Sequence, residues 1–328
     1  MVSRISVPLL RVSLLQCRTF CTQEFPVGPN DERVQELLLR MTGMDFDKVF
    51  AAKKEPLKLP QYRLMTMEEL KEVHAETTAK AGELLRMPPI VPVREPQGEV
   101  GERDEILDQY LDNKMVFTDT TQHKENKERR IVVRETDGTL RDANWDERDR
   151  MCQLFFPVLG RKMWLPPVLQ GGSETMASLR SHFHVNILDR VCLQCEPDSE
   201  DYTKIHHAVY DHTDENRLHD LLRSTTYFGS MVWYLVTVKN NISGLLKDML
   251  SKKLLSDAVD LLALYSMVYP ETELPHNTTD TDITKIQFIK VCTGTVHKGM
   301  YWYSSLTNVI NPIPLFMGSW VHGFMSSR

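Results

Sequence analysis

The fold is centred on the segment Tyr227-Phe-Gly-Ser-Met-Val-Trp-Tyr-Leu-Val-Thr-Val238. When the segment is wound as a helix, apolar side chains occur on nearly every side, which is typical of a helix buried all round. The apolar run is shorter than the roughly eighteen residues that indicate a membrane span. It therefore predicts the central helix of a packed helical region, with no transmembrane segment.

Helical spacing continues on both sides of this segment, from Glu174 onward. Before it, Pro197-Asp-Ser-Glu200 begins a helix, and Leu218, Leu221 and Leu222 mark a short one. After it, apolar positions repeat at helical spacing over 242–250 and again over 254–268, until Pro270 ends the run. Short turns between such helices predict antiparallel hairpins, packed like a solenoid or a bundle. A further helix is expected around 286–296.

The middle of the chain changes to the two-residue period of β-strands. Met115–Thr121 and Arg130–Glu135 are rich in β-branched and apolar residues, and Asp137-Gly138 is a strong hairpin turn leading into Thr139–Arg141. Asn144-Trp-Asp-Glu147 then predicts a capped helix that ends before Pro157. We therefore expect a small antiparallel β-hairpin region followed by one helix.

The N-terminal third predicts short helices and extended chain. An amphipathic helix is expected over Asp31–Thr42, and a capping box, Thr66-Met-Glu-Glu69, begins another that runs to about Met87. The apolar stripe of this second helix is thin, so it is better stabilised by a partner than by its own small core. Residues 88–114 are rich in proline and then in acids, which predicts an extended connector without regular structure.

The first residues are typical of a mitochondrial presequence. Arg4, Arg11 and Arg18 fall near one helical face, and no acid occurs before Glu24. A secretory signal is the alternative, but Pro8 and Arg11 interrupt the apolar core that it needs. Removing residues 1–21 takes away three positive charges and changes the formal net charge from −6 to −9. A working chain this acidic excludes broad nucleic-acid binding, so any RNA contact is expected to be local.

Five segments are expected along the chain. They are a presequence (1–21), N-terminal helices and extended connectors (22–114), a β-hairpin and helix region (115–172), an α-helical domain (173–300) and an atypical apolar tail (301–328). The predicted class is therefore mainly α, with a small β region in the middle and extended N-terminal segments.

No catalytic or cofactor-binding motif is found, and the chain is predicted to be no enzyme, with no cofactor and no small-molecule substrate. His207 and Asp211, one helical turn apart, are the best metal pair, but a solvated helix face is the favoured interpretation. Cys192 and Cys195 have the spacing of half a zinc site or of a redox dithiol; buried structural thiols are favoured.

Two small cationic clusters are the candidate contacts for RNA phosphates. Phosphate contacts of this kind orient a protein without reading sequence. Glu125 and Glu128 interleave the first cluster, so an ordinary charged loop is an equal alternative, and no aromatic stacking platform is visible. The candidate residues are Lys124, Lys127, Arg129 and Arg130 in the first cluster, with Arg161 and Lys162 in the second.

Several strings of this sequence resemble one family. Ile131-Val-Val-Arg-Glu135, Gly138-Thr-Leu-Arg141 and the string from Trp145 to Met151 closely resemble the metazoan mitochondrial small-subunit ribosomal proteins numbered twenty-two, a mitochondria-specific family. Further colinear matches run from about residue 31 to about residue 300, and the tail after Tyr301 departs from the family. Those matches include Met41-Thr-Gly43, Met87-Pro-Pro89, Glu196-Pro-Asp-Ser199 and Met231-Val-Trp-Tyr234.

The resemblance implies a structural, non-enzymatic subunit of the mitochondrial ribosome in the matrix. Its expected partners are other small-subunit ribosomal proteins and, locally, the small-subunit ribosomal RNA. The residues alone leave an alternative open, a free helical-repeat adapter or assembly factor in the matrix. The long non-globular connector favours the ribosomal subunit, because a free adapter gains nothing from it.

Overall fold

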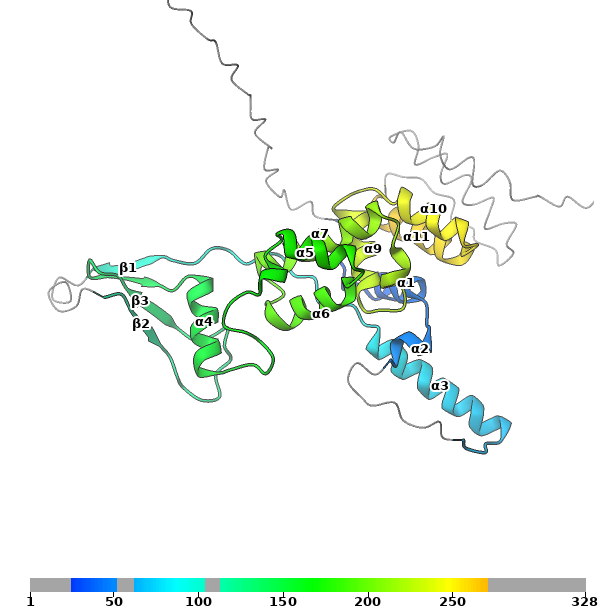
Figure 1. Cartoon of the computed structure of the whole chain (residues 1–328), viewed down its shortest axis with the longest axis horizontal. Coiled ribbons are helices and arrows are strands. Elements are labelled where there is room, and N and C mark those ends of the chain that lie inside the picture. The colour runs from blue at the N-terminus through cyan, green and yellow to red at the C-terminus, as the bar shows by residue number, and fades with distance from the viewer. Residues whose placement is uncertain (1–24, 52–61, 104–112, 271–328) are drawn as a thin grey trace, which may run out of the picture.

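A computed structural model describes residues 25–51, 62–103 and 113–270 of the chain (Figure 1). The described part is mainly helical with one small antiparallel sheet in the middle, which confirms the predicted fold class. None of its helices is long and apolar enough to cross a membrane. The predicted presequence, the helix expected around 286–296 and the apolar tail lie outside the described residues.

In chain order the elements are α1 (Glu32–Thr42), α2 (Phe46–Val49), α3 (Met67–Leu84), β1 (Val100–Arg103), β2 (Met115–Thr118), β3 (Ile131–Arg134), β4 (Thr139–Asp142), α4 (Trp145–Phe155), the 3-10 turn η2 (Pro167–Leu169), α5 (Ser173–Arg180), α6 (His184–Gln194), α7 (Glu200–Glu215), α8 (His219–Leu222), α9 (Tyr227–Thr237), α10 (Ser243–Ser251) and α11 (Leu255–Val268).

Helix α9 lies at the centre of the helical body, which comprises α1 and α5–α11. Ten of its eleven residues are buried, as its all-round apolar pattern predicts. Short turns pair α6 with α7 and α10 with α11, and these pairs pack around the central helix. Helix α7 begins at Glu200, as the sequence predicts, and the Ser199 hydroxyl caps it by accepting a hydrogen bond from the Tyr202 amide.

Helix α1 belongs to this body although it lies far away in the sequence. It packs against α9 and α11, and its apolar residues Val34, Leu37, Leu38 and Met41 are part of the same core. At its edge the Arg40 guanidinium donates to Asp260 at 2.9 Å. The N-terminal segment is therefore tied to the last helices of the described chain rather than forming a separate arm.

The sheet has strand order β1-β4-β3-β2, and all its pairings are antiparallel. Strands β2, β3 and β4 and the Asp137-Gly138 turn occur where the sequence predicts them. The prediction of no regular structure over 88–114 was wrong for β1, which pairs with β4 through a bulge at Gly101. Val-Gly-Glu-Arg has no apolar alternation, so only backbone pairing at the sheet edge makes this strand.

The sheet module, which comprises β1–β4 and α4, has only a small apolar core. Ile131, Val133 and Ala143 are its buried apolar residues, with Met151 and Cys152 of α4 packed against them. Figure 1 shows the module beside the helical body, with the connector (residues 86–99) running between them toward β1. A core this small needs polar contacts to fix its loops.

Candidate functional site

The β2–β3 loop, which carries the first cationic cluster, is folded around Arg129. The Arg129 guanidinium donates to the backbone oxygens of Asp119 (3.2 Å), Thr121 (2.6 Å) and Lys124 (2.7 Å), and to the Asn126 side chain (3.1 Å). It also lies 3.6 Å from the centre of the Phe156 ring. Arg129 is only 4% exposed. Its charge therefore holds the loop together, and of the six candidates it is the least able to reach a phosphate.

A second buried arginine supports the same loop from α4. Arg148 donates to the backbone oxygens of Lys127 (3.1 Å) and Asn126 (3.4 Å). It shares the inward side of α4 with Cys152, and this position is the sequence signal that could have identified it. The loop conformation is therefore fixed by two guanidinium groups bound to backbone oxygens.

The remaining cations of the first cluster display their charge. The side chain of Arg130 is 81% exposed, with Asp142 at 3.9 Å, and Lys127 is exposed with Asp198 at 3.7 Å. Lys124 pairs with Asp119 at 3.0 Å, and hydrogen bonds from Thr121 and then Lys124 lower the pKa of the Asp119 carboxyl. Arg130 and Lys127 therefore extend from a rigid loop, and Lys124 is partly neutralised.

The two residues of the second cluster differ in the same way. Arg161 pairs with Glu196 at 2.7 Å and donates to the Leu193 backbone oxygen at 3.1 Å. Lys162 is exposed, and its backbone exchanges two hydrogen bonds with the Gln194 side chain. Arg161 thus fixes the α4–α5 segment on α6, and Lys162 presents its charge beside it.

An exposed tryptophan next to this cluster was missed by sequence reasoning. Trp164 is largely exposed, and the Arg150 guanidinium lies 4.4 Å from its ring centre. Leu159 and Val158, in the turn before it, are exposed as well. The signal was present in the sequence, since an apolar run continues past the end of α4 without helical spacing. The second cluster therefore combines a cation with an apolar, aromatic surface.

Ion pairs tie the first cluster to the connector at the junction between the sheet module and the helical body, and a cavity lined by the second cluster lies at the same junction. Asp198 lies 3.7 Å from Lys127 and 3.9 Å from Arg94, and Arg94 also pairs with Asp149 at 2.7 Å. Arg94 stacks on Trp145, 4.2 Å from the ring centre. A polar cavity of about 250 Å³ lies here, and Arg94, Arg161, Lys162 and Trp164 are among the residues that line it. The junction therefore sets how the two clusters are placed.

Replacing Arg94 with alanine is expected to loosen this junction. The change removes a largely buried guanidinium that pairs with Asp149 and stacks on Trp145. Hydrogen bonds to charged groups contribute about 2 kcal/mol, so we expect a loss of that size in the free energy of unfolding and faster proteolysis of the connector. Arg86→Ala, at an exposed connector position, is the matched control. Equal proteolysis of the two variants would show that Arg94 does not hold the junction.

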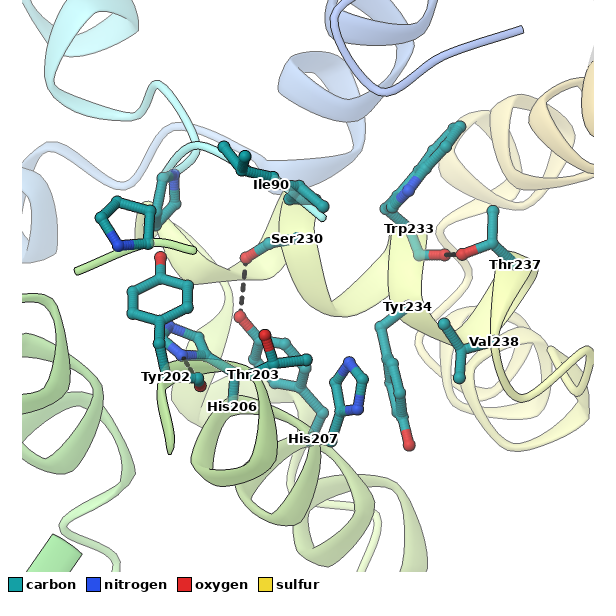
Figure 2. Close-up of a pocket in the computed structure, with 14 residues that line it drawn as sticks. Ile90, Tyr202, Thr203, His206, His207, Ser230, Trp233, Tyr234, Thr237 and Val238 are labelled. Carbon is teal, nitrogen blue, oxygen red and sulfur yellow. Dashed lines mark hydrogen bonds between the residues drawn. The ribbon is translucent and has the colours of Figure 1, made fainter. Parts of the chain in front are cut away.

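A second cavity, of about 110 Å³ and lined by several aromatic side chains, lies between α7, α9 and the start of the connector (Figure 2). Tyr210 and Ser230 hydrogen-bond across its base at 2.7 Å. Burial lowers the pKa of His206 to about 4, so this histidine is neutral at physiological pH. The cavity is an apolar packing site. Its lining includes Pro88, Ile90, Val91, Tyr202, His206, His207, Tyr210, Trp233 and Tyr234.

His207 and Asp211, the metal pair considered from the sequence, are both engaged with Tyr234. The His207 ring stacks on the Tyr234 ring at 4.3 Å between centres (Figure 2), and burial lowers the pKa of His207. Asp211 accepts from the Tyr234 hydroxyl at 2.9 Å and from Lys239 at 2.8 Å. Among the described residues, no group of three histidine, cysteine or acidic side chains could hold a metal.

The two cysteines of the CxxC pair are structural thiols. Cys195 is buried, and burial raises its pKa to about 12. Cys192 is half-buried, 3.7 Å from the Tyr227 hydroxyl and 3.9 Å from His206 Nε2, and burial raises its pKa. Thiols with raised pKa values are poor nucleophiles and poor metal ligands at neutral pH. This agrees with the interpretation favoured from the sequence.

Comparison with known proteins gives one consistent family. A model of the family described as "Mitochondrial 28S ribosomal protein S22" matches residues 29–270, which include both the sheet module and the helical body. The chain is 38% identical over 294 residues to the Bos taurus protein named "Small ribosomal subunit protein mS22", covering 87% of this chain and 81% of the relative. It is 39% identical over 272 residues to the Mus musculus protein of the same name, covering 83% and 75%. This chain therefore belongs to the mitochondrial 28S ribosomal protein S22 family.

Proposed function

We propose that this chain is a structural subunit of the small subunit of the mitochondrial ribosome. In this role it holds neighbouring ribosomal proteins and ribosomal RNA in position for translation in the matrix. The observation that carries the proposal is the family match over 29–270, which spans nearly all of the described structure. The names of the bovine and mouse relatives support it. No reaction is assigned to the chain.

Sedimentation of the tagged full chain tests this function. A gentle mitochondrial lysate is run on a sucrose gradient with and without ribonuclease. Comigration with the small ribosomal subunit, shifted to lighter fractions by ribonuclease, is the expected result. A light peak that ribonuclease does not change would instead favour the free adapter or assembly factor.

Within this role, the displayed cations are the proposed contacts to ribosomal RNA. Lys127, Arg130 and Lys162 present charge at the surface, and Lys124 adds a partly neutralised one. Arg129 and Arg161 act through the loops that they fix. Because the formal net charge of the chain is −6, contacts of this kind are local and position the protein without reading sequence.

Removing these three charges is expected to weaken the salt dependence of RNA binding. For the variant Lys127→Ala/Arg130→Ala/Lys162→Ala, the slope of log K against log salt should fall in magnitude by about 2 to 3, since each phosphate contact contributes about 0.7 to 0.9. The probe is a transcript of the mitochondrial small-subunit ribosomal RNA. Lys71→Ala/Lys80→Ala/Arg180→Ala removes three exposed cations elsewhere. Equal slopes for the two variants would contradict the assignment.

A further inference from the structure

Among the residues that the structure describes, few pack against helix α3. It has 18 residues, and Ala81, near its C-terminal end, is the only buried one. Figure 1 shows it extending away from the helical body, next to the short α2. Its stability has local sources, because the capping box of Thr66 and Glu69 is formed. Helix α3 is therefore stabilised by its own cap, while few of its side chains pack against other elements.

One side of α3 carries no charge. At 100° per residue, Met67, Leu70, His74, Thr77, Ala81 and Leu84 fall on one face, and Val73 borders it. Near the C-terminal end of this face Ala81 is buried and Leu84 is 53% exposed, and in the middle His74 meets the ring of Phe46 in α2. Toward the N-terminal end it is open, since Met67 is 71% and Leu70 is 50% exposed.

The exposed apolar surface extends beyond the helix itself. Tyr62 and Leu64, just before α3, are almost fully exposed, and Met44 and Phe50, on either side of α2, are exposed as well. An apolar surface formed by neighbouring elements in this way marks an interaction site rather than scattered surface residues. The apolar side chains of this face recur at helical spacing and so form a continuous stripe, along which a helix or segment of a partner can pack.

The opposite side of α3 identifies the chemistry of the partner. It carries five glutamates, Glu68, Glu69, Glu72, Glu76 and Glu83, and two lysines, Lys71 and Lys80. This acidic side repels phosphates, so RNA is disfavoured. Glu69 and Glu76, four residues before and three residues after Val73, are the glutamates that adjoin the apolar face. A protein segment with one apolar side and lysine or arginine along one edge matches both the face and these two glutamates.

We propose that α3 is a docking helix for another protein, which covers the face of Met67, Leu70 and Val73 with an apolar segment. Basic side chains of that protein lie against Glu69 and Glu76, which adjoin Val73. The inference rests on the proposed function for the assembly in which the partner is found, the small ribosomal subunit. Beyond that function, the inference specifies the chemistry of the partner protein and identifies α3 as the helix that binds it.

Site-specific photo-crosslinking tests the proposal directly. A photoreactive amino acid replaces Leu70 or, as the control, Ala79 at the centre of the charged side, and small subunits are isolated from cells depleted of their own copy. The expected result is an adduct from Leu70 to one protein, at a segment with apolar residues and adjoining lysine or arginine, and little from Ala79. An adduct to RNA, or none, in small subunits that contain the chain would overturn the proposal.

Paired variants give a second, independent readout. Leu70→Asp should lower incorporation into small subunits about tenfold, as expected for a central interface residue, and Ala79→Asp should not. Both positions are exposed, so neither change should alter the thermal midpoint of the free chain. Glu76→Lys, beside Val73, should lower incorporation and Glu72→Lys, on the far side with Ala79, should not. An increase with Glu76→Lys would point to RNA and overturn the proposal. Absence of the unmodified chain from small subunits would instead contradict the proposed function.

Discussion

Replacing Arg129 with methionine is expected to lower the free energy of unfolding by about 3 kcal/mol. The guanidinium makes four hydrogen bonds in the β2–β3 loop, three of them to backbone oxygens, and lies against the Phe156 ring. Methionine keeps the apolar contact but leaves these partly buried acceptors without the guanidinium donor that holds the loop. Urea unfolding followed by circular dichroism measures the change.

Arg130 provides the matched control. It follows Arg129 directly, but its side chain points to the opposite side of the backbone and is 81% exposed. Arg130→Met should change the free energy of unfolding by about 0.5 kcal/mol or less. For RNA binding we expect the reverse: Arg130→Met should clearly reduce the slope of log K against log salt, and Arg129→Met should change it less. If Arg129→Met left stability unchanged and weakened RNA binding, Arg129 would be a phosphate contact rather than a structural residue.

Acid is expected to destabilise the helical body through two buried histidines. Burial lowers the pKa of His206 to about 4. The pKa of His184 is also lowered to about 4, first by burial and then by the neighbouring His212, whose Nδ1 lies 3.0 Å from His184 Nε2. In the unfolded chain both have a pKa of about 6.5. Between pH 4 and pH 6.5 the unfolded chain binds more protons at these histidines than the folded chain does. The free energy of unfolding is therefore highest above pH 6.5 and falls as the pH drops toward 4.

The expected loss is about 3 kcal/mol for each histidine over this window, with a slope of about 1.4 kcal/mol per pH unit for each proton. Urea unfolding at a series of pH values measures the slope. His206→Gln should remove about half of it, and His74→Gln, at an exposed position, should remove none. Paired carboxyls such as Glu147, whose pKa Arg141 lowers to about 2, contribute only at lower pH. An unchanged slope in His206→Gln would show that His206 is not the group that titrates.

The sequence predicted the elements whose signals are local. The capping box at Thr66 forms where the sequence predicted it, and the all-round apolar pattern of α9 matches its burial. Strand β1 escaped prediction because its pairing with β4 depends on the backbone of a distant segment. The packing of α1 with α9 and α11 is equally non-local.

The candidate site shows the same limit. Composition identified the six cations but gave no way to separate Arg129 from Arg130, because a buried and an exposed guanidinium have the same sequence signature. The distinction comes from the backbone oxygens that a folded loop presents to one of them. Likewise, Arg94 lay in a segment expected to be irregular, and its role depends on Asp149 and Trp145 from another part of the chain.

The packing of α1 sets an order for folding. Arg40 and its partner Asp260 are 220 residues apart, so α1 is synthesised long before α11 exists. Closing so large a loop has an entropic cost that is offset only once the contacts with α9 and α11 form. Until then the apolar residues Val34, Leu38 and Met41 have no native partner. As long as α11 has not joined the body, part of the apolar face of α1 therefore has no native cover, and the N-terminal helix can complete its packing only with the last helix of the described chain.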